Sequence, residues 1–273
     1  MKNKTVENAL KAMLYEVVVN PKPGLVDPTQ HQSHGDMDVF TFIDSSLSLS
    51  DYFYEVYETG ANFRDADLTE LFKLLRPIGV QAEKTMFEAT RGVNTHKGVI
   101  FSLGILVAAA AYSPDSIIET TKKMLVGLTK TDLLQVTEKT NLTAGERQFL
   151  EYGFTGVRGE AEAGFPIVTE IGLAFLRETR GDRNQRLLDT LLKISEFLPD
   201  SNLIKRSGDP EILTVYHKMV ELYFSLGGSE TELGRRQFER LRQKLAIHKL
   251  SLGGSADMLI ITIFLALQEG LDF

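Results

Sequence analysis

The spacing of apolar residues is the feature that most limits what this chain can fold into. Apolar residues recur every three or four positions nearly everywhere, which places them on one face of a helix. The first such stripe includes Ala9, Met13 and Val17, and it stops at Pro21 and Pro23 because proline cannot continue a helix. No run of alternating apolar and polar residues indicates a strand. The pattern therefore predicts an all-α fold of about ten helices around one core.

Helix starts are marked by side chains that cap free backbone N–H groups. Asp67 is expected to cap one helix, in which Pro77 is expected to cause a bend or a break. Thr143 and Glu146 form a capping-box pattern at another helix, and Ser255 is expected to cap the last. These starts separate long apolar stripes into individual helices.

Length and composition are compatible with one large core. The chain has 273 residues, of which 43% are hydrophobic. A chain of this size buries about three quarters of the surface that its unfolded form exposes. We find neither an internal repeat nor a low-complexity segment, so residues 1–273 are predicted to form a single domain.

The net charge of −7 argues against a general nucleic-acid-binding protein, which would usually show a basic face. It leaves a nucleotide substrate open, because screening acts over about 8 Å and a few cations in a cleft outweigh distant acids. The absence of cysteine excludes disulfides, thiolate catalysis and cysteine-bound zinc.

The chain offers no obvious membrane-targeting segment. Its first residues lead into an amphipathic pattern rather than an apolar signal core. The longest apolar stretches, 99–112 and 258–267, fall short of the roughly 20 residues that span a bilayer. A cytoplasmic protein with no membrane contact is expected.

Four connections between predicted helices are dense in glycine, charged and amide residues: 20–38, 92–98, 153–165 and 251–257. Loops of this kind on a rigid scaffold commonly carry function. Glu16 with 21–27 (PKPGLVD), 34–38 (HGDMD), 92–98 (GVNTHKG), 155–165 (TGVRGEAEAGF), 200–202 (DSN) with Arg206, and 253–257 (GGSAD) follow one another along nearly the whole chain. Together these stretches resemble the triphosphoribosyl-dephospho-CoA synthase family. That family makes the prosthetic-group precursor of citrate lyase, and a relative serves malonate decarboxylase.

The resemblance implies a defined reaction. The triphosphoribosyl group of ATP would move to a ribose hydroxyl of 3'-dephospho-CoA, adenine would leave, and 2'-(5''-triphosphoribosyl)-3'-dephospho-CoA would form. The product would pass to a downstream partner, the holo-citrate lyase acyl-carrier transferase. Such a glycosyl transfer needs negative charge near an oxocarbenium-like transition state and a base for the hydroxyl. It also needs cations for the triphosphate, a role that suits Mg²⁺. The resemblance leaves open whether the chain forms a homo-oligomer.

Four acids are the predicted catalytic residues and magnesium ligands. Asp36 and Asp38 lie two residues apart near a predicted helix start, where capping is the alternative role. Glu160 and Glu162 would point the same way only in an extended segment, and a solvated charged loop is their alternative. In both cases the resemblance favours a metal or catalytic role. Asp27 and Asp257 are two further candidate acids. Asp257 is also placed to cap a helix, which is its alternative role.

The predicted phosphate and substrate contacts come from the same stretches. Residues 94–98 lie where a loop enters an apolar helix, and free N–H groups at a helix start attract phosphate. No Walker loop is present. Each cation has an alternative as a surface charge or as the partner of a neighbouring acid. The predicted contacts are Lys22, Asn94, His96, Lys97, Arg158, Arg206 and Ser255.

Two other functions compete with the transferase. A metal-dependent hydrolase of nucleotides or ADP-ribosyl bonds would use similar acids and glycine turns, with water in place of dephospho-CoA. A non-catalytic helical adaptor would bind no nucleotide and would leave the charged loops without a purpose. Dependence of adenine release on dephospho-CoA separates the two enzymes, and Mg-ATP binding separates both from the adaptor.

Overall fold

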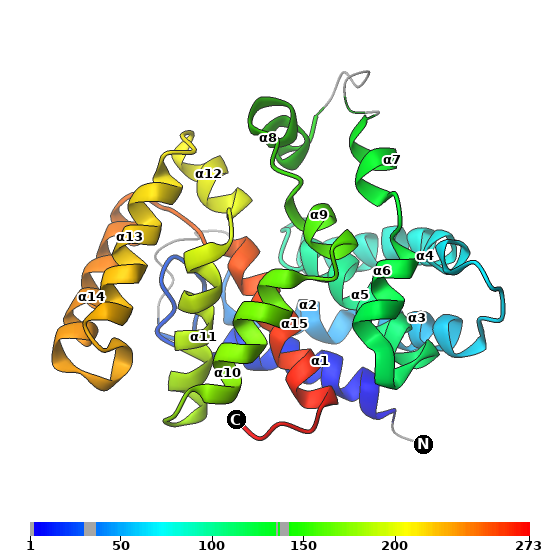
Figure 1. Cartoon of the computed structure of the whole chain (residues 1–273), viewed down its shortest axis with the longest axis horizontal. Coiled ribbons are helices and arrows are strands. Elements are labelled where there is room, and N and C mark those ends of the chain that lie inside the picture. Colours follow the sequence, from blue (N-terminus) through cyan, green and yellow to red (C-terminus); the bar gives the residue numbers. More distant parts are fainter. Residues whose placement is uncertain (1–2, 30–36, 135, 137–141) are drawn as a thin grey trace.

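The computed structural model describes residues 3–29, 37–134, 136 and 142–273, and this part of the chain contains helices and no β-strand (Figure 1). The all-α prediction is confirmed. The helices are α1 (Lys4–Val18), α2 (Val39–Ser48), α3 (Ser50–Asn62), α4 (Leu68–Ala89), α5 (Lys97–Tyr112), α6 (Ile117–Met124), α7 (Leu128–Leu134), α8 (Ala144–Tyr152), α9 (Gly156–Glu162), α10 (Leu173–Glu178), α11 (Arg183–Phe197), α12 (Ser201–Ser207), α13 (Ile212–Ser225), α14 (Glu232–Ile247) and α15 (Gly253–Gln268). Short 3-10 helices η1 (Pro114–Ser116) and η4 (Gly228–Glu230) and a π-helix η3 (Ile167–Gly172) complete them.

The helices exceed the predicted number of about ten because connections as short as one residue separate neighbours, as Leu49 separates α2 from α3. Asp67 caps α4, and Thr143 with Glu146 forms the predicted capping box of α8. Pro77 lies inside an unbroken α4, so the helix does not divide there. The prediction that Ser255 caps α15 is wrong, because Ser255 lies within the first turn of that helix.

Two central helices, α5 and α15, form the middle of the molecule (Figure 1). Both are apolar on all sides, which is typical of a helix that is buried on all sides. Helices α3, α4 and α6 pack around α5, whereas α1 and α11 pack against α15, and the two central helices also touch each other. Within the described residues no helix is long and apolar enough to cross a membrane. This packing brings the polar N-terminal turns of α5 and α15 together.

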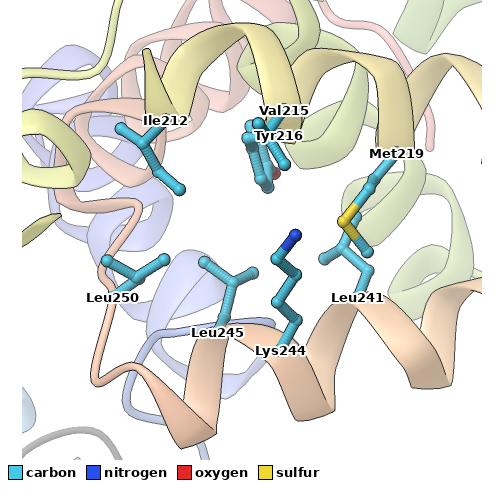
Figure 2. A pocket seen from close by; sticks show the side chains of 8 residues that line it. All are labelled: Ile212, Val215, Tyr216, Met219, Leu241, Lys244, Leu245 and Leu250. Carbon is cyan, nitrogen blue, oxygen red and sulfur yellow. The ribbon is translucent and has the colours of Figure 1, made fainter. Parts of the chain in front are cut away.

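A second apolar cluster joins α13 and α14, which lie side by side at one end of the molecule (Figure 1). The small gap between these two helices is lined by apolar side chains and by Lys244 (Figure 2). Its volume is about 10 Å³, roughly the room that one water molecule needs. This gap is therefore a packing defect rather than a ligand site.

Candidate active site

The N-terminus of α15 is capped by an acid from another part of the chain. Asp200, buried immediately before α12, accepts hydrogen bonds from the backbone nitrogen atoms of Gly254 and Ser255 at 3.3 and 2.8 Å. The Ser255 hydroxyl donates to the same carboxylate at 2.8 Å. A Cβ atom on Gly254 would lie 3.0 Å from Asp200 Oδ1, which explains why a residue without a side chain stands there. The hydroxyl predicted to bind substrate is thus engaged by Asp200.

The same turn of α15 brings Asp257 against the start of α5. A Cβ atom on Gly98 would lie 2.0 Å from Asp257 Oδ2, so the carboxylate touches the backbone of α5 at a position where only glycine leaves room. Burial raises the pKa of Asp257 well above its usual range, and the negative charges of Asp200 and Glu16 raise it further. Two stretches far apart in the sequence, 92–98 and 253–257, therefore meet here.

Lys22 forms a buried ion pair instead of reaching solvent or an open site. Its Nζ lies 2.6 Å from Glu16 Oε1 and 2.7 Å from the Glu16 carbonyl oxygen, and the two side chains are 2% and 4% exposed. The backbone nitrogen of Lys22 donates to Asp27 at 2.7 Å. The ammonium predicted to hold phosphate is thus engaged inside the protein, and Asp27 fixes the loop that carries it.

We expect Lys22→Met to destabilise the protein by about 3–5 kcal/mol, because it leaves the Glu16 carboxylate buried without its partner. Urea unfolding at neutral pH measures the change. The double replacement Lys22→Met with Glu16→Leu should recover most of the loss, since no buried charge remains. A single variant as stable as the wild type would contradict the buried ion pair.

His96 is a buried neutral side chain rather than a cation. Its Nδ1 lies 2.8 Å from Ser45 Oγ, and its ring meets the Phe42 ring edge-on at 5.2 Å. Burial and, to a smaller extent, the positive charge of Lys22 lower the pKa of His96 to about 3. His96, a predicted phosphate contact, therefore supplies no positive charge at neutral pH, because burial disfavours the protonated ring.

This burial gives His96 a measurable effect on stability. The unfolded chain takes up a proton near pH 6.5 and the folded chain does not, so stability falls as pH drops below that value. Between pH 7.5 and 5.0 the loss due to His96 is about 2 kcal/mol. Urea unfolding at both pH values measures the loss of stability between them. The loss in His96→Gln should be smaller than in the wild type by that amount. Equal losses in both proteins would contradict a buried neutral His96.

A cavity of about 370 Å³ opens beside the start of α5, within the size range of small-molecule sites. Lys97 and Arg158, both predicted phosphate ligands, line this cavity from α5 and α9, and Arg76 joins them from α4. Gly98 is also part of its wall, so the cavity adjoins the contact with Asp257. The residues that line the cavity are Tyr52, Phe72, Leu75, Arg76, Gly79, Val80, Glu83, Lys97, Gly98, Ile100, Phe101, Ile105, Asp132, Val157 and Arg158.

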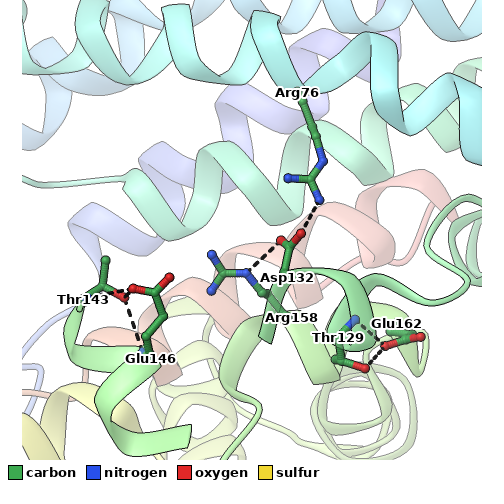
Figure 3. A network of polar contacts seen from close by, with 7 residues as sticks. All are labelled: Arg76, Thr129, Asp132, Thr143, Glu146, Arg158 and Glu162. Atoms are coloured by element: carbon green, nitrogen blue, oxygen red, sulfur yellow. Dashed lines mark hydrogen bonds and ion pairs between the residues drawn. The ribbon is translucent and has the colours of Figure 1, made fainter. Parts of the chain in front are cut away.

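The cations of the cavity are paired with carboxylates from its own walls. Lys97 Nζ lies 2.7 Å from Glu83 Oε2. Asp132 bridges two arginines, with Oδ1 2.7 Å from Arg76 Nη2 and Oδ2 3.1 Å from Arg158 Nε (Figure 3). The three cationic side chains are between 34% and 52% exposed, so solvent and ligands reach them. A polyphosphate can compete for these cations with the two acids.

Glu160 and Glu162 both lie in α9, so the extended geometry that would align them is absent. Glu162 accepts hydrogen bonds from the backbone nitrogens of Gly127 and Thr129 at 2.8 and 2.9 Å and from the Thr129 hydroxyl, and so caps α7 (Figure 3). Burial pushes the pKa of Glu162 upward, but these hydrogen bonds outweigh it and lower the pKa. Its carboxylate is committed to the helix start.

Glu160 is less engaged. Its Oε2 accepts a hydrogen bond from the Ile167 backbone nitrogen at 3.3 Å, and among the described residues no donor reaches the other oxygen. Burial raises the pKa of Glu160, and the charge of Glu170 adds to the rise. Glu160 shares one face of α9 with Val157, a residue of the cavity wall three positions earlier.

The other predicted residues take local roles or lie outside the described part. Asp38 has its alternative role, the capping of α2, and its Oδ1 accepts a hydrogen bond from the Thr41 backbone nitrogen at 2.9 Å. Asp36 lies outside the described residues. Asn94 Oδ1 accepts the Lys97 backbone nitrogen at 3.3 Å, and Arg206 donates to the Lys249 carbonyl oxygen at 3.1 Å. Neither Asn94 nor Arg206 lines the cavity.

Of the predicted magnesium ligands, the three in the described part of the chain, Asp38, Glu160 and Glu162, do not form a metal-binding group. In the described ranges no three His, Asp or Glu side chains lie together as they would around a metal ion. Asp38 and Glu162 each use their carboxylates to cap a helix. Asp36 lies outside the described residues, so the four-carboxylate magnesium site stays a prediction. The carboxylates nearest the cations of the cavity belong instead to Glu83 and Asp132.

Arg76, Glu83 and Asp132 were absent from the sequence-based predictions. All three lie on helices, where charged residues usually face solvent, and none belongs to a glycine-rich stretch. Spacing does not reveal that Arg76 and Arg158 reach one carboxylate, since they come from different helices. The sequence signal for this arginine pair was the family resemblance at residues 155–165, and that stretch contains Arg158 but not Arg76.

Comparison with known proteins agrees with the resemblance. Residues 2–272 match the family described as ATP:dephospho-CoA triphosphoribosyl transferase. The chain belongs to this family. A probable 2-(5''-triphosphoribosyl)-3'-dephosphocoenzyme-A synthase of Lactiplantibacillus plantarum is 54% identical over 269 residues, which cover 96% of each chain. No solved structure matches the chain.

Two other relatives match nearly the whole of this chain but different shares of their own lengths. Protein CitXG of Leuconostoc mesenteroides subsp. cremoris is 49% identical over 98% of this chain but 60% of its own length. A probable 2-(5''-triphosphoribosyl)-3'-dephosphocoenzyme-A synthase of Citrobacter koseri is 39% identical over 94% of this chain and 88% of its own.

Proposed function

We propose that this chain moves the triphosphoribosyl group of ATP to 3'-dephospho-CoA, with release of adenine, in the cavity between α4, α5, α7 and α9. The observation that carries the proposal is the convergence of Arg76, Lys97 and Arg158, from three helices, on one cavity in a chain of this family. ATP carries several negative charges on its triphosphate, and cations that converge from rigid helices are suited to hold them.

Binding of the triphosphate replaces the carboxylates of the cavity wall. Phosphate oxygens take up the guanidinium groups that Asp132 now bridges, and arginine binds phosphate through two parallel hydrogen bonds. Lys97 turns from Glu83 toward the phosphates as a point charge. The released carboxylates then line a site where positive charge develops on the ribose, which they stabilise electrostatically.

The chemistry joins two substrates without cleaving the triphosphate. The bond from C1' of the ATP ribose to N9 of adenine breaks, and its electron pair passes into the purine. The dephospho-CoA hydroxyl oxygen forms a bond to C1' and loses its proton to a base. We assign that base to Glu160, whose raised pKa and unengaged oxygen suit proton uptake. Mg²⁺ would accompany ATP, bound mainly by phosphate oxygens with one or two carboxylates, and it would supply charge neutralisation.

The product then serves as the prosthetic-group precursor of citrate lyase, and the holo-citrate lyase acyl-carrier transferase is its proposed recipient. A cytoplasmic location, where ATP is available, belongs to the same proposal. Homo-oligomer formation stays an open prediction that size-exclusion chromatography with light scattering would test.

Adenine release tests the proposed function directly. Protein is incubated with Mg-ATP in the presence and absence of dephospho-CoA, and free adenine is quantified by chromatography. The transferase predicts adenine only when dephospho-CoA is present, whereas a hydrolase predicts it in both samples. A non-catalytic adaptor predicts none, and no rise in melting temperature with Mg-ATP.

A further inference from the structure

Asp257 differs from the other buried acids near the site. Asp200 holds the start of α15 through several hydrogen bonds, Glu16 is paired with Lys22, and Asp27 binds the backbone of its own loop. Across the described ranges Asp257 has no hydrogen bond and no ion pair. A half-buried carboxyl group without partners costs stability, so its presence calls for a reason other than folding.

Asp257 does not itself line the cavity, but its carboxyl group contacts the cavity wall at Gly98. Its Oδ2 lies 2.0 Å from where a Cβ atom on Gly98 would be, on the face of α5 to which residue 98 belongs. Phe101 and Ile105, three and seven residues later, share that face and line the cavity, as does Gly98. The carboxyl group therefore contacts the face of α5 that carries these cavity residues, at the end near the helix start.

The surroundings favour a carboxyl group that keeps its proton. Asp200 and Glu16 face Asp257 with negative charge from the start of α12 and from α1. The nearby Lys22 is committed to Glu16, and His96 is neutral. Burial, together with these two acids, raises the pKa of Asp257, so the group stays protonated to a higher pH than an ordinary aspartic acid.

We propose that Asp257 is the general acid of the transfer, which donates its proton to a ring nitrogen of adenine as the C1'–N9 bond breaks. The inference rests on the proposed function and adds the group that makes adenine a good leaving group. The electron pair of the broken bond enters the purine, the Asp257 proton neutralises it, and neutral adenine departs. The proton lost by the attacking hydroxyl restores the balance through solvent.

The test compares two leaving groups in Asp257→Asn. One substrate is ATP, and the other is the 5'-triphosphate of 4-nitrophenyl β-D-riboside, whose nitrophenolate leaves without a proton. Turnover of ATP with dephospho-CoA should fall about 10²- to 10⁴-fold, the usual contribution of a general acid. Turnover of the nitrophenyl substrate should fall less than about tenfold. Equal losses on both substrates, or unchanged turnover of ATP, would overturn the assignment.

Two further measurements keep the test decisive. With ATP, wild-type turnover should decline at high pH as Asp257 loses its proton, and Asp257→Asn should lack this decline. Its melting temperature should not fall, because the carboxyl group makes no hydrogen bond to lose, whereas a structural role predicts a lower value. Asp189→Asn serves as the control, since Asp189 is buried beside Tyr223 and Ser229 and does not line the cavity. This replacement should leave turnover unchanged. A wild-type protein that releases no adenine would instead refute the proposed function itself.

Discussion

Replacing Lys97 and Arg158 together with glutamine is expected to lower the affinity for ATP about a hundred- to ten-thousandfold. Both side chains line the cavity, from α5 and from α9, and both are partly exposed. A hydrogen bond to a charged group contributes about 1.5–3 kcal/mol, and every 1.4 kcal/mol changes affinity tenfold. Isothermal titration with Mg-ATP measures the change, because it needs no turnover.

A matched control separates this effect from a general loss of charge. Arg177 pairs with Glu269 at 2.6 Å on the surface, with an exposed fraction of 46%, and it does not line the cavity. Arg177→Gln removes a comparable ion pair and should leave ATP affinity within about twofold of the wild type, since exposed pairs contribute little. If the double variant binds ATP as tightly as this control, the triphosphate lies elsewhere.

Glu160→Gln is expected to reduce turnover about 10²- to 10⁴-fold, the usual contribution of a general base, with little change in ATP affinity. The amide keeps the size of the side chain and can still accept the hydrogen bond from the Ile167 nitrogen. The acidic limb of the pH–rate profile should flatten, because the group that must lose its proton is gone. Single-turnover assays of adenine release, run at several pH values, measure the rate and its pH dependence.

The variant Asp38→Asn separates the predicted catalytic role of Asp38 from its role as the cap of α2. Asparagine caps a helix as well as aspartate does, so the start of α2 should remain stable. Lost turnover at unchanged stability would favour the predicted catalytic role of Asp38, and normal turnover would leave it as a capping residue.

For the Glu160→Gln variant, normal turnover would refute the assignment of Glu160 as the base.

The fold was largely predictable, because apolar residues at helical spacing and capping residues such as Asp67 act locally. Residue-level predictions failed where tertiary contacts decide. Lys22 lies between two prolines in an apparently exposed loop, yet the fold buries it against Glu16. His96 loses its proton for the same reason, since neighbouring helices exclude water from it.

The candidate site was predictable in part. The glycine-rich stretches identified Lys97 and Arg158, which line one cavity, but not Arg76 and Asp132, which complete its charge pattern from within helices. The role of Asp200 also depends on a distant partner, because its carboxylate caps a helix that begins more than fifty residues later. Such long-range pairs leave no trace in local spacing, so only the folded chain reveals them.

The fate of labelled ATP tests the central claim most directly. ATP that carries one isotope in its ribose and another in its γ-phosphate is incubated with the protein and dephospho-CoA, and the products are resolved by mass spectrometry. A triphosphoribosyl transfer predicts unlabelled adenine and a single dephospho-CoA adduct that contains both isotopes. Labelled ADP, free phosphate or pyrophosphate, or both isotopes in free ribose triphosphate, would contradict it.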